Sequence, residues 1–318
     1  MKYYIAADGG GTKLNAVLYD ENFCLLRAAK TGGINTVSRD ENLIRAGTER
    51  AAADLLCDSG IKEIEELSVS LANRNSFFYD AVCKFAAVKR YVYYNEGKAV
   101  LASAGLKYGL VAQAGTGSDI FVEQQGFSEI FGGLGSILGD EGGGFDIGVK
   151  TIKSAIAAYE GRGAKTLLQP MVFQYFGIEK PRDLLRFVQR EDFREKIAKA
   201  TYLTEEAAKQ GDKIARNIYR AAGREMAEQT LSALRTLRGK EIQGKIIVSG
   251  GAWKGCAEMF SAFKNKIGKH CVIPVEFPVF EPVIGCAIAR YFAAGADYKD
   301  IEKNVRKNFS DYLFRRKT

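Results

Sequence analysis

The chain has 318 residues, of which 47% are hydrophobic and 26% are charged, and this length and composition suit two folded domains. It has no run of eighteen apolar residues and no signal-peptide pattern, so we expect a cytoplasmic protein with no membrane partner. The net charge of +8 suits an anionic ligand. The basic tail, which ends Arg315-Arg316-Lys317, has aromatic neighbours, but its spacing equally fits an amphipathic helix packed on the body. We therefore expect no nucleic acid among the partners.

The cysteine and histidine contents argue against several kinds of site. The six cysteines show no CxxC spacing, which argues against zinc binding and disulfides. His270 is the only histidine, so a two-histidine metal site is excluded and a Ser-His-Asp triad is disfavoured. The chain also lacks GxxxxGK[ST], and no GxGxxG follows a strand, which argues against a P-loop enzyme and a dinucleotide-binding domain.

A short apolar strand, Lys2–Asp8, leads directly into the turn Gly9-Gly10-Gly11-Thr12-Lys13. Adjacent glycines allow several backbone N–H groups to converge on one anion, because no Cβ obstructs them. Thr12 adds a hydroxyl donor and Lys13 adds positive charge. Asp8, at the end of the strand, supplies a carboxylate that could hold a metal ion. The pattern predicts a phosphate site with an adjacent metal ligand.

The same design returns later in the chain, where strand Gly109–Ala114 leads into Gly115-Thr116-Gly117-Ser118. Each glycine loop is followed by a strand, a short turn and another strand. These following strands are predicted at 14–19 and 23–29 for the first loop, and at 119–123 and 127–131 for the second. The repetition predicts a duplicated fold in which two loops grip one polyphosphate from both sides. The alternative is a pair of unrelated β-hairpins.

In the rest of the chain, strands alternate with helices, which indicates an α/β fold with largely parallel strands. Asp40 is a predicted helix N-cap. The other strands are expected at 66–72, 91–95 and 245–248, with an extended segment at 272–279. The helices are expected at 40–58, 77–89, 98–104, 145–159, much of 164–238, 255–266, from 283 onward, and 298–315.

Five motifs together resemble those of the sugar kinase/Hsp70/actin superfamily. Asp8-Gly-Gly-Gly-Thr-Lys13 is similar to its first phosphate motif and Ala114-Gly-Thr-Gly-Ser118 to its second. Val248-Ser-Gly-Gly-Ala-Trp253 resembles its adenosine motif. Within that superfamily, Leu138-Gly-Asp-Glu-Gly142 resembles a block of the N-acetylglucosamine kinase and BadF/BadG/BcrA/BcrD ATPase family, and Pro282-Val-Ile-Gly-Cys-Ala287 fits its C-terminal element. The five motifs follow the order of the family.

The resemblance implies an α/β fold with two RNase H-like (actin-like ATPase) domains that flank a central nucleotide cleft. The N-terminal domain is expected to cover 1–114, with the last helix (296–318) packing back onto it, and the C-terminal domain to cover 115–295. ATP and Mg²⁺ are the implied cofactors, with Asp8 as the metal ligand. The residues implied to bind ATP and its phosphates are Gly9, Gly10, Gly11, Thr12, Lys13, Gly115, Thr116, Gly117, Ser118, Gly250, Gly251 and Trp253.

The resemblance also implies transfer of the γ-phosphoryl group to a sugar hydroxyl, at O6 in the N-acetylhexosamine kinases. Glu96 occupies the place of the family's catalytic aspartate, with one additional methylene, and we expect it to be the general base. The alternative is that Glu96 caps the following helix. Asp140 is the next candidate for the base, and in similar kinases this aspartate binds sugar hydroxyls. Its alternative role is an N-cap.

Asn35 and Thr116, together with Glu96 and Asp140, complete the residues expected to bind the sugar. Asn35 resembles the loop asparagine that contacts the sugar, whereas the alternative is an Asx-turn. Two departures concern the substrate. The chain has Gly132-Gly-Leu-Gly135 where the family often has Gly-Gly-Trp-Gly, and Thr36-Val37 where an aromatic residue often follows the asparagine.

The interpretation that we favour is an ATP-dependent kinase of an amino sugar, N-acetylglucosamine or a related N-acetylhexosamine such as N-acetylmuramate, acting as a homodimer. One alternative is an ATPase activator of the 2-hydroxyacyl-CoA dehydratase type, which would need paired exposed cysteines for an iron–sulfur cluster. Another is a regulatory or filament-forming relative without catalysis. Regulatory relatives usually carry an N-terminal DNA-binding helix-turn-helix, whereas the first predicted strand here begins at residue 2.

Overall fold

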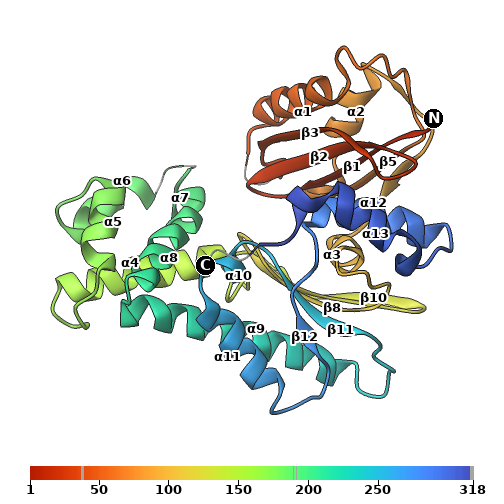
Figure 1. Ribbon diagram of the computed structural model, residues 1–318. Coiled ribbons are helices and arrows are strands. Elements are labelled where there is room, and N and C mark those ends of the chain that lie inside the picture. Colours follow the sequence, from red (N-terminus) through yellow and green to blue (C-terminus); the bar gives the residue numbers. More distant parts are fainter. Residues whose placement is uncertain (37–38, 189, 191, 316–318) are drawn as a thin grey trace. The chain divides into compact units, whose positions relative to one another are not determined.

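The computed structural model describes residues 1–36, 39–188, 190 and 192–315 (Figure 1). The chain forms two compact units. Unit 1 contains Met1–Leu110, Glu123–Phe127 and Phe277–Phe314, and most of unit 2 lies in Val111–Val122 and Ser128–Glu276. Within the described residues, each unit is built around a five-stranded sheet.

The sheet of unit 1 has the strand order β3-β2-β1-β5-β7. Its strands are β1 (Tyr3–Gly9), β2 (Lys13–Asp20), β3 (Leu25–Gly32), β5 (Glu66–Leu71) and β7 (Tyr91–Tyr93). The first three strands form an antiparallel meander, whereas β5 pairs with β1, and β7 with β5, in parallel. The carboxyl ends of β1 and β5 therefore meet at one edge of the sheet, where Asp8 pairs with Ser70 in the register. A separate parallel pair is formed by β4 (Glu63–Ile64) and β6 (Ala87–Val88).

Helices cover both faces of this sheet because successive side chains of a strand point to opposite faces. The helices of unit 1 are α1 (Glu41–Leu56), α2 (Phe77–Cys83), α3 (Glu96–Ser103), α12 (Pro282–Ala293) and α13 (Tyr298–Asn308), with short 3₁₀ turns η1 (Ala72–Arg74) and η3 (Ser310–Tyr312). Ile5 and Ala7 of β1 are buried in the core shared with α1 and α2. Tyr4 and Ala6 are buried in a second core, shared with α3, α12 and α13.

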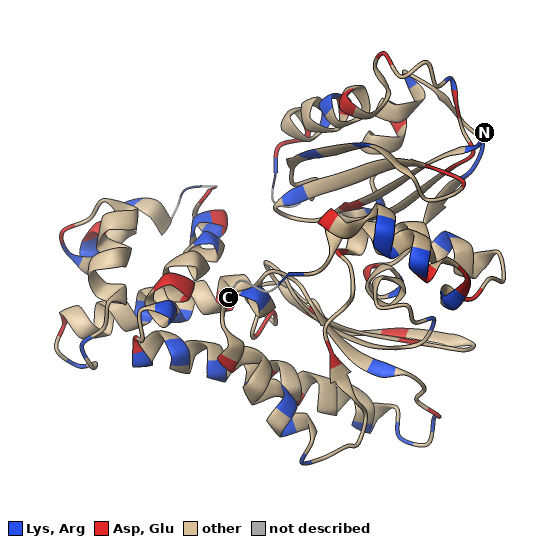
Figure 2. Ribbon diagram, in the orientation of Figure 1, with Lys and Arg blue, Asp and Glu red and all other residues tan. Residues whose placement is uncertain are grey.

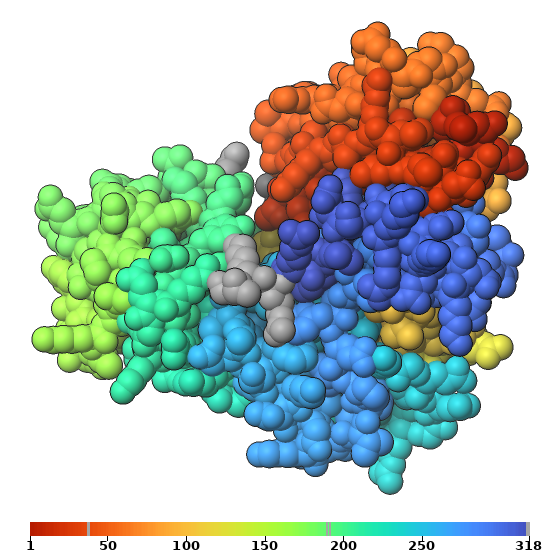
Figure 3. All heavy atoms as spheres, viewed as in Figure 1, coloured from red at the N-terminus to blue at the C-terminus, as the bar shows by residue number. Residues whose placement is uncertain are grey.

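Helix α12 belongs to unit 1, although we expected residues up to 295 in the C-terminal domain. It packs on α3 and β1. A Cβ on Gly285 would lie 1.8 Å from the carbonyl oxygen of Ala99, so only glycine permits this close approach. Gly105 makes a similar approach to the ring of Tyr298, which anchors α13. In the space-filling view, the dark-blue C-terminal part of unit 1 lies against its red and orange N-terminal part, as the packing of α12 on β1 requires (Figure 3).

The sheet of unit 2 has the order β10-β9-β8-β11-β12, which repeats the order of unit 1. Its strands are β8 (Gly109–Ala114), β9 (Ser118–Gln124), β10 (Phe127–Gly132), β11 (Lys245–Ser249) and β12 (Val275–Glu276). In both sheets the first three strands in the chain are neighbours in sequence order, and two later strands extend the sheet beyond the first of them. The predicted duplication is therefore present in the strand order.

The helices of unit 2 lie mainly between β10 and β11. They are α4 (Gly144–Tyr159), α5 (Leu168–Phe176), η2 (Pro181–Leu184), α6 (Leu185–Val188), α7 (Phe193–Lys199), α8 (Thr201–Lys209), α9 (Lys213–Thr236), α10 (Ala252–Gly255) and α11 (Ala257–Ile267). α4 packs on α5, α7 and α8, and α9 packs along α11. A Cβ on Gly223 would lie 2.1 Å from the carbonyl oxygen of Met259, so glycine sets the spacing of α9 and α11.

Two predicted helices are shorter in the structure. α2 ends at Cys83 rather than at residue 89, because Ala87–Val88 pairs with β4. α13 ends at Asn308 rather than at residue 315, and Leu313 then forms a bridge with Phe280. The expected continuation to 316–318 lies outside the described residues. Among the helices that are described, none is long and apolar enough to cross a membrane.

Candidate active site

The first glycine loop joins β1 to β2 and leaves part of its backbone open. The Gly10 N–H donates to the carbonyl oxygen of Lys13 at 3.0 Å, which closes the turn, while Gly11 and Thr12 are exposed. A Cβ on Gly10 would meet no described atom within 4 Å, and Gly10 does not have a positive φ. The fold itself therefore does not require glycine here, and the open space beside this backbone suits a ligand such as a phosphate.

The loop that carries Asn35 is packed directly on the first glycine loop. The Ile34 N–H donates to the carbonyl oxygen of Gly10 at 2.9 Å. A Cβ on Gly33 would lie 2.1 Å from the carbonyl oxygen of Gly11, and a Cβ on Gly9 would lie 2.8 Å from Ile34. These glycines are needed for packing, in contrast to Gly10. The structure thus brings Asn35 next to the predicted phosphate loop.

Asp8 lies half-buried at the end of β1, beside the same loop. Burial raises the pKa of its carboxyl to about 6, the charge of Lys13 opposes this rise, and the charge of Glu281 adds to it. The Lys13 Nζ lies 3.9 Å from the Glu281 Oε2, so both charges sit close to Asp8. Sequence reasoning missed Glu281, although it directly precedes the quoted Pro282 motif.

The surroundings of Asp8 fit a magnesium site of the kind found in phosphoryl-transfer enzymes. No group of three or more His, Cys, Asp or Glu side chains among the described residues could hold a metal by itself. Mg²⁺ is often bound by one or two carboxylates, with phosphate oxygens and water as the other ligands. Asp8, next to an open glycine loop, matches that arrangement.

Glu96 is the first residue of α3, and Asn95 is the N-cap. The Asn95 Oδ1 accepts the Lys98 N–H at 2.8 Å, and its Nδ2 donates to the buried Glu123 at 2.5 Å. The side-chain cap of α3 is thus supplied by Asn95, and Glu96 lies in the first turn of the helix, where an acid also interacts favourably with the helix N-terminus. The neighbouring Asn95 is held at both ends of its amide, so the backbone that carries Glu96 is well positioned.

The second glycine loop joins β8 to β9 and contacts the start of α4. The N–H groups of Gly144 and Phe145 donate to the carbonyl oxygens of Gly115 and Thr116 at 2.8 and 2.9 Å. The only described atom within 4 Å of a Cβ on Gly115 would be the Gln113 Nε2, at 4.0 Å. Gly115 thus resembles Gly10 in the first loop, because its side-chain position is open.

Asp140 is packed against the second glycine loop. Its carboxylate lies 2.7 Å from the position of a Cβ on Gly117, and its Oδ1 accepts the Ser118 N–H at 3.3 Å. Asp140 is buried and has φ +65°, a left-handed conformation that costs energy for a residue other than glycine. The Ser118 hydroxyl, which we expected to contact phosphate, is buried and donates instead to the Glu141 carbonyl oxygen.

A second carboxylate, Asp119, lies near Asp140 and was not among the predicted site residues. Burial raises the pKa of Asp119 to about 6, and the charge of Asp140 adds to the rise. A Cβ on Gly133 would lie 1.8 Å from the Asp119 Oδ1, so glycine makes room for this carboxylate. Its position directly after Gly115-Thr116-Gly117-Ser118 is the sequence signal that could have identified it.

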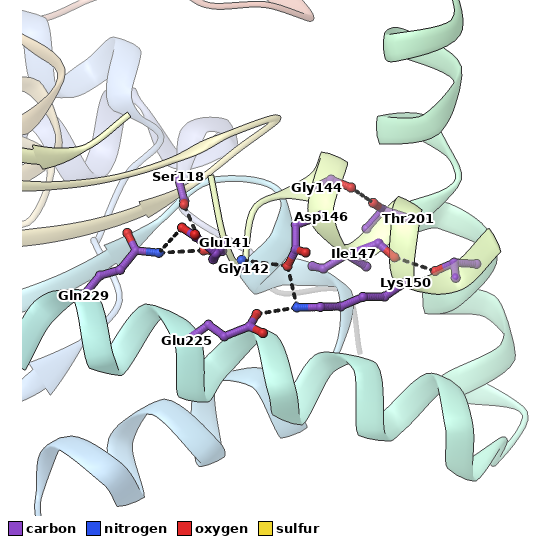
Figure 4. Close-up of polar contacts among 11 residues, drawn as sticks. Ser118, Glu141, Gly142, Gly144, Asp146, Ile147, Lys150, Thr201, Glu225 and Gln229 are labelled. Atoms are coloured by element: carbon purple, nitrogen blue, oxygen red, sulfur yellow. Dashed lines mark hydrogen bonds and ion pairs between the residues drawn. The ribbon is translucent and has the colours of Figure 1, made fainter. Parts of the chain in front are cut away.

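A polar network holds the Asp140–Gly143 turn on α4 and α9 (Figure 4). The Gly142 N–H donates to the Asp146 Oδ2 at 2.9 Å, and Lys150 bridges Asp146 and Glu225. The Gln229 Nε2 donates to the Glu141 carbonyl oxygen at 2.9 Å. These contacts fix the turn next to Asp140, because its backbone groups are satisfied by side chains of two helices.

The predicted adenosine motif lies at the end of β11, beside the second loop. Gly250 has φ +108°, and a Cβ on it would lie 2.2 Å from the carbonyl oxygen of Ala114. A Cβ on Gly251, by contrast, would meet no described atom within 4 Å. Trp253 is 1% exposed and donates its Nε1–H to the Ala112 carbonyl oxygen at 3.0 Å. The Trp253 ring therefore lies in the core of unit 2, and its expected contact with the nucleotide stays a prediction.

Each unit therefore places a glycine loop after its first strand, with acidic residues beside it, and unit 2 adds a second open glycine turn. Together with the repeated strand order, this is the architecture of a two-domain actin-like ATPase. Residues 7–289 match the BadF/BadG/BcrA/BcrD ATPase family, and the chain belongs to this family.

Two curated relatives and one solved structure are similar over most of their length. The N-acetylmuramic acid/N-acetylglucosamine kinase of Clostridium acetobutylicum is 25% identical over 275 residues, which cover 83% of this chain and 90% of the relative. The N-acetyl-D-glucosamine kinase of Dictyostelium discoideum is 26% identical over 272 residues, covering 78% and 84%. The crystal structure of the putative N-acetylglucosamine kinase of Porphyromonas gingivalis is similar with a TM-score of 0.69 at 17% identity, and the likeness covers 92% of this chain and all of the other. That structural likeness shows the fold.

Proposed function

We propose that this protein is an ATP-dependent kinase of an amino sugar. The acceptor in this proposal is N-acetylglucosamine or a related N-acetylhexosamine such as N-acetylmuramate, with phosphorylation at O6. The observation that carries the ATP part is the pair Gly10 and Gly251, which the fold does not require to be glycine and whose side-chain positions are open. The names of the two curated relatives support the amino-sugar part.

In this proposal, different residues have different roles in phosphoryl transfer. In the proposal, both glycine loops bind the phosphates through backbone N–H groups, and Lys13 adds charge. Asp8 would hold a Mg²⁺ ion, which would supply positive charge to neutralise the charge that develops on the phosphate oxygens. Asn35 and Asp140, with Thr116 and Asp119, bind sugar hydroxyls.

Glu96 is the proposed general base. It takes the proton of the acceptor hydroxyl while that oxygen forms its bond to the γ-phosphorus and the bond from this phosphorus to the β–γ bridging oxygen breaks. ADP and the sugar phosphate are the products. The buried Glu123 supports this role indirectly, because it holds the Asn95 amide next to Glu96.

An ADP-release assay with Mg-ATP tests the proposal against a panel of amino sugars and hexoses. We expect ADP release to require an N-acetylhexosamine and to stop when EDTA removes the magnesium. Mass spectrometry of the product identifies the phosphorylated hydroxyl. ATP hydrolysis that proceeds without any sugar, and that no sugar stimulates, would contradict the kinase proposal and favour an ATPase activator.

A further inference from the structure

A strained segment follows β5 in unit 1. Asn73 and Arg74 have φ values of +61° and +47°, so two consecutive residues other than glycine are left-handed. Asparagine tolerates this conformation because its short polar side chain can form local hydrogen bonds, whereas arginine lacks this compensation and adopts it at a cost. Strain of this kind persists only where surrounding contacts hold it, and it is common at binding sites.

Hydrogen bonds tie this segment to the loop that carries Asn35. The Asn73 Nδ2 donates to the Asn35 Oδ1 at 2.8 Å and to the Thr36 Oγ1 at 3.1 Å. The Asn75 Nδ2 donates to the carbonyl oxygen of Ile34 at 2.9 Å. Arg74 is therefore fixed between two residues that bind the predicted sugar loop.

The side chain of Arg74 lies over Tyr93 at the end of β7. Its guanidinium carbon is 4.7 Å from the centroid of the Tyr93 ring. Burial raises the pKa of Tyr93, Arg74 opposes this rise, and the charge of Glu96 adds to it, so Arg74 and Glu96 both act on Tyr93. Among the described residues, no carboxylate forms an ion pair with Arg74, whereas exposed Arg45 and Arg90 both have acidic partners.

We propose that Arg74 binds a carboxylate on the acceptor sugar. The substrate class would then be an N-acetylhexosamine with an acidic substituent, such as the lactyl ether of N-acetylmuramate, and this inference rests on the proposed function. A guanidinium has a planar set of N–H donors that matches a carboxylate, and the Tyr93 ring holds that plane in place. The positive net charge of the chain also favours a sugar that carries a negative charge.

The experiment compares N-acetylmuramate with N-acetylglucosamine as acceptors for the wild type, Arg74→Met and Arg45→Met. Arg45→Met is the matched control, because the Arg45 guanidinium also lies over a ring, that of Phe77, at 4.4 Å. Loss of a charge-assisted hydrogen bond should raise the KM for N-acetylmuramate about 10- to 100-fold in Arg74→Met. The KM for N-acetylglucosamine should stay within about twofold, since this sugar has no carboxylate. Arg45→Met should change the KM for neither sugar.

Calorimetric titration of the two sugars separates this inference from the proposed function. Weaker binding of N-acetylmuramate alone in Arg74→Met supports the carboxylate site even if neither sugar is phosphorylated. Equal weakening of both sugars would overturn it, because Arg74 would then act only through the structure of the loop. A wild type that phosphorylates N-acetylglucosamine but does not bind N-acetylmuramate would overturn it too, while leaving the kinase proposal intact.

Discussion

The carboxylate of Asp140 occupies the space that a Cβ on Gly117 would need, since its Cγ and both oxygens lie 2.7 Å from that point. The same carboxylate accepts the Ser118 N–H. The second glycine loop and Asp140 therefore cannot move independently. In a kinase, this relationship would link the place of the phosphates to the place of the acceptor.

Gly117→Ala should push Asp140 away from the second glycine loop. The new Cβ would overlap the Asp140 carboxylate, and overpacking of this kind costs about 1–3 kcal/mol. We expect the sugar KM to rise at least about tenfold, which corresponds to about 1.4 kcal/mol, and the melting temperature to fall. Steady-state kinetics and thermal melting measure the two effects.

Gly47→Ala is the control for this substitution. Gly47 lies inside α1, and its Cβ would make only ordinary contacts with Thr31, at 3.6 Å or more. Alanine favours a helix over glycine by about 1 kcal/mol, so stability should rise with kinetics unchanged. If Gly117→Ala behaves like Gly47→Ala, the tight packing of Asp140 on the loop has no role in sugar binding.

Gly10→Ala and Gly251→Ala should weaken nucleotide binding without harming the fold. Neither new Cβ would meet a described atom within 4 Å, so the melting temperature of the free protein should be unchanged or higher. A Cβ would, however, obstruct close approach of the phosphates or the adenosine. The stabilisation of the protein by ATP, measured as the shift in melting temperature, should shrink in both variants. Full stabilisation by ATP in both would exclude these glycines from the site.

Much of the fold could be predicted from the sequence, because helix caps, turns and strand patterns depend on residues that are close together in the chain. The Asp40 cap was predicted and is confirmed, since its carboxylate accepts the Asn42 N–H at 2.9 Å. The repeated strand, loop and strand pattern predicted the matching order of both sheets. The place of α12 could not be predicted in this way. It depends on the approach of Gly285 to Ala99, which are far apart in the sequence, and the Pro282 motif does not show which unit the helix joins.

The site was predicted less completely, because the direction of a side chain depends on the packing around it. Trp253 and Ser118 lie within binding-type motifs, yet both point into unit 2 and hydrogen-bond to backbone carbonyls. Asp119 and Arg74 were missed because they lie outside the quoted motifs. Asp119 directly follows the second glycine motif, which is a sequence signal, but its closeness to Asp140 and the place of Arg74 over Tyr93 appear only in the folded chain.

Asp8→Asn should raise stability at neutral pH and abolish Mg²⁺-dependent turnover. Burial raises the pKa of Asp8 from 3.8 to about 6, so the folded protein favours the protonated carboxyl. The contribution of protonated Asp8 to the free energy of unfolding is complete below about pH 4 and is lost as the pH rises through about 6. The wild type should therefore be less stable than Asp8→Asn at pH 7.5, and the difference should shrink towards pH 5. Melting temperatures over this pH range measure the effect.

Asp54→Asn is the control for Asp8→Asn, because Asp54 is an exposed acid on α1. Its melting temperature should follow that of the wild type at every pH. A drop in the stability of Asp8→Asn at pH 7.5 would mean that the charged carboxylate is favoured by the fold. Normal turnover in Asp8→Asn would exclude Asp8 as the magnesium ligand.

Glu96→Gln should reduce kcat by about 10²–10⁴-fold, the usual contribution of a positioned general base, with a smaller change in sugar affinity. The amide keeps the size of the side chain but cannot accept the hydroxyl proton. Glu41→Gln is the matched control, since Glu41 is also the first residue of a helix and follows the N-cap Asp40 as Glu96 follows Asn95. Both substitutions remove the same favourable interaction of an acid with a helix N-terminus. Only Glu96→Gln should lose turnover. If Glu96→Gln keeps a near-normal kcat while Asp140→Asn is inactive, the two roles are exchanged and Asp140 is the base.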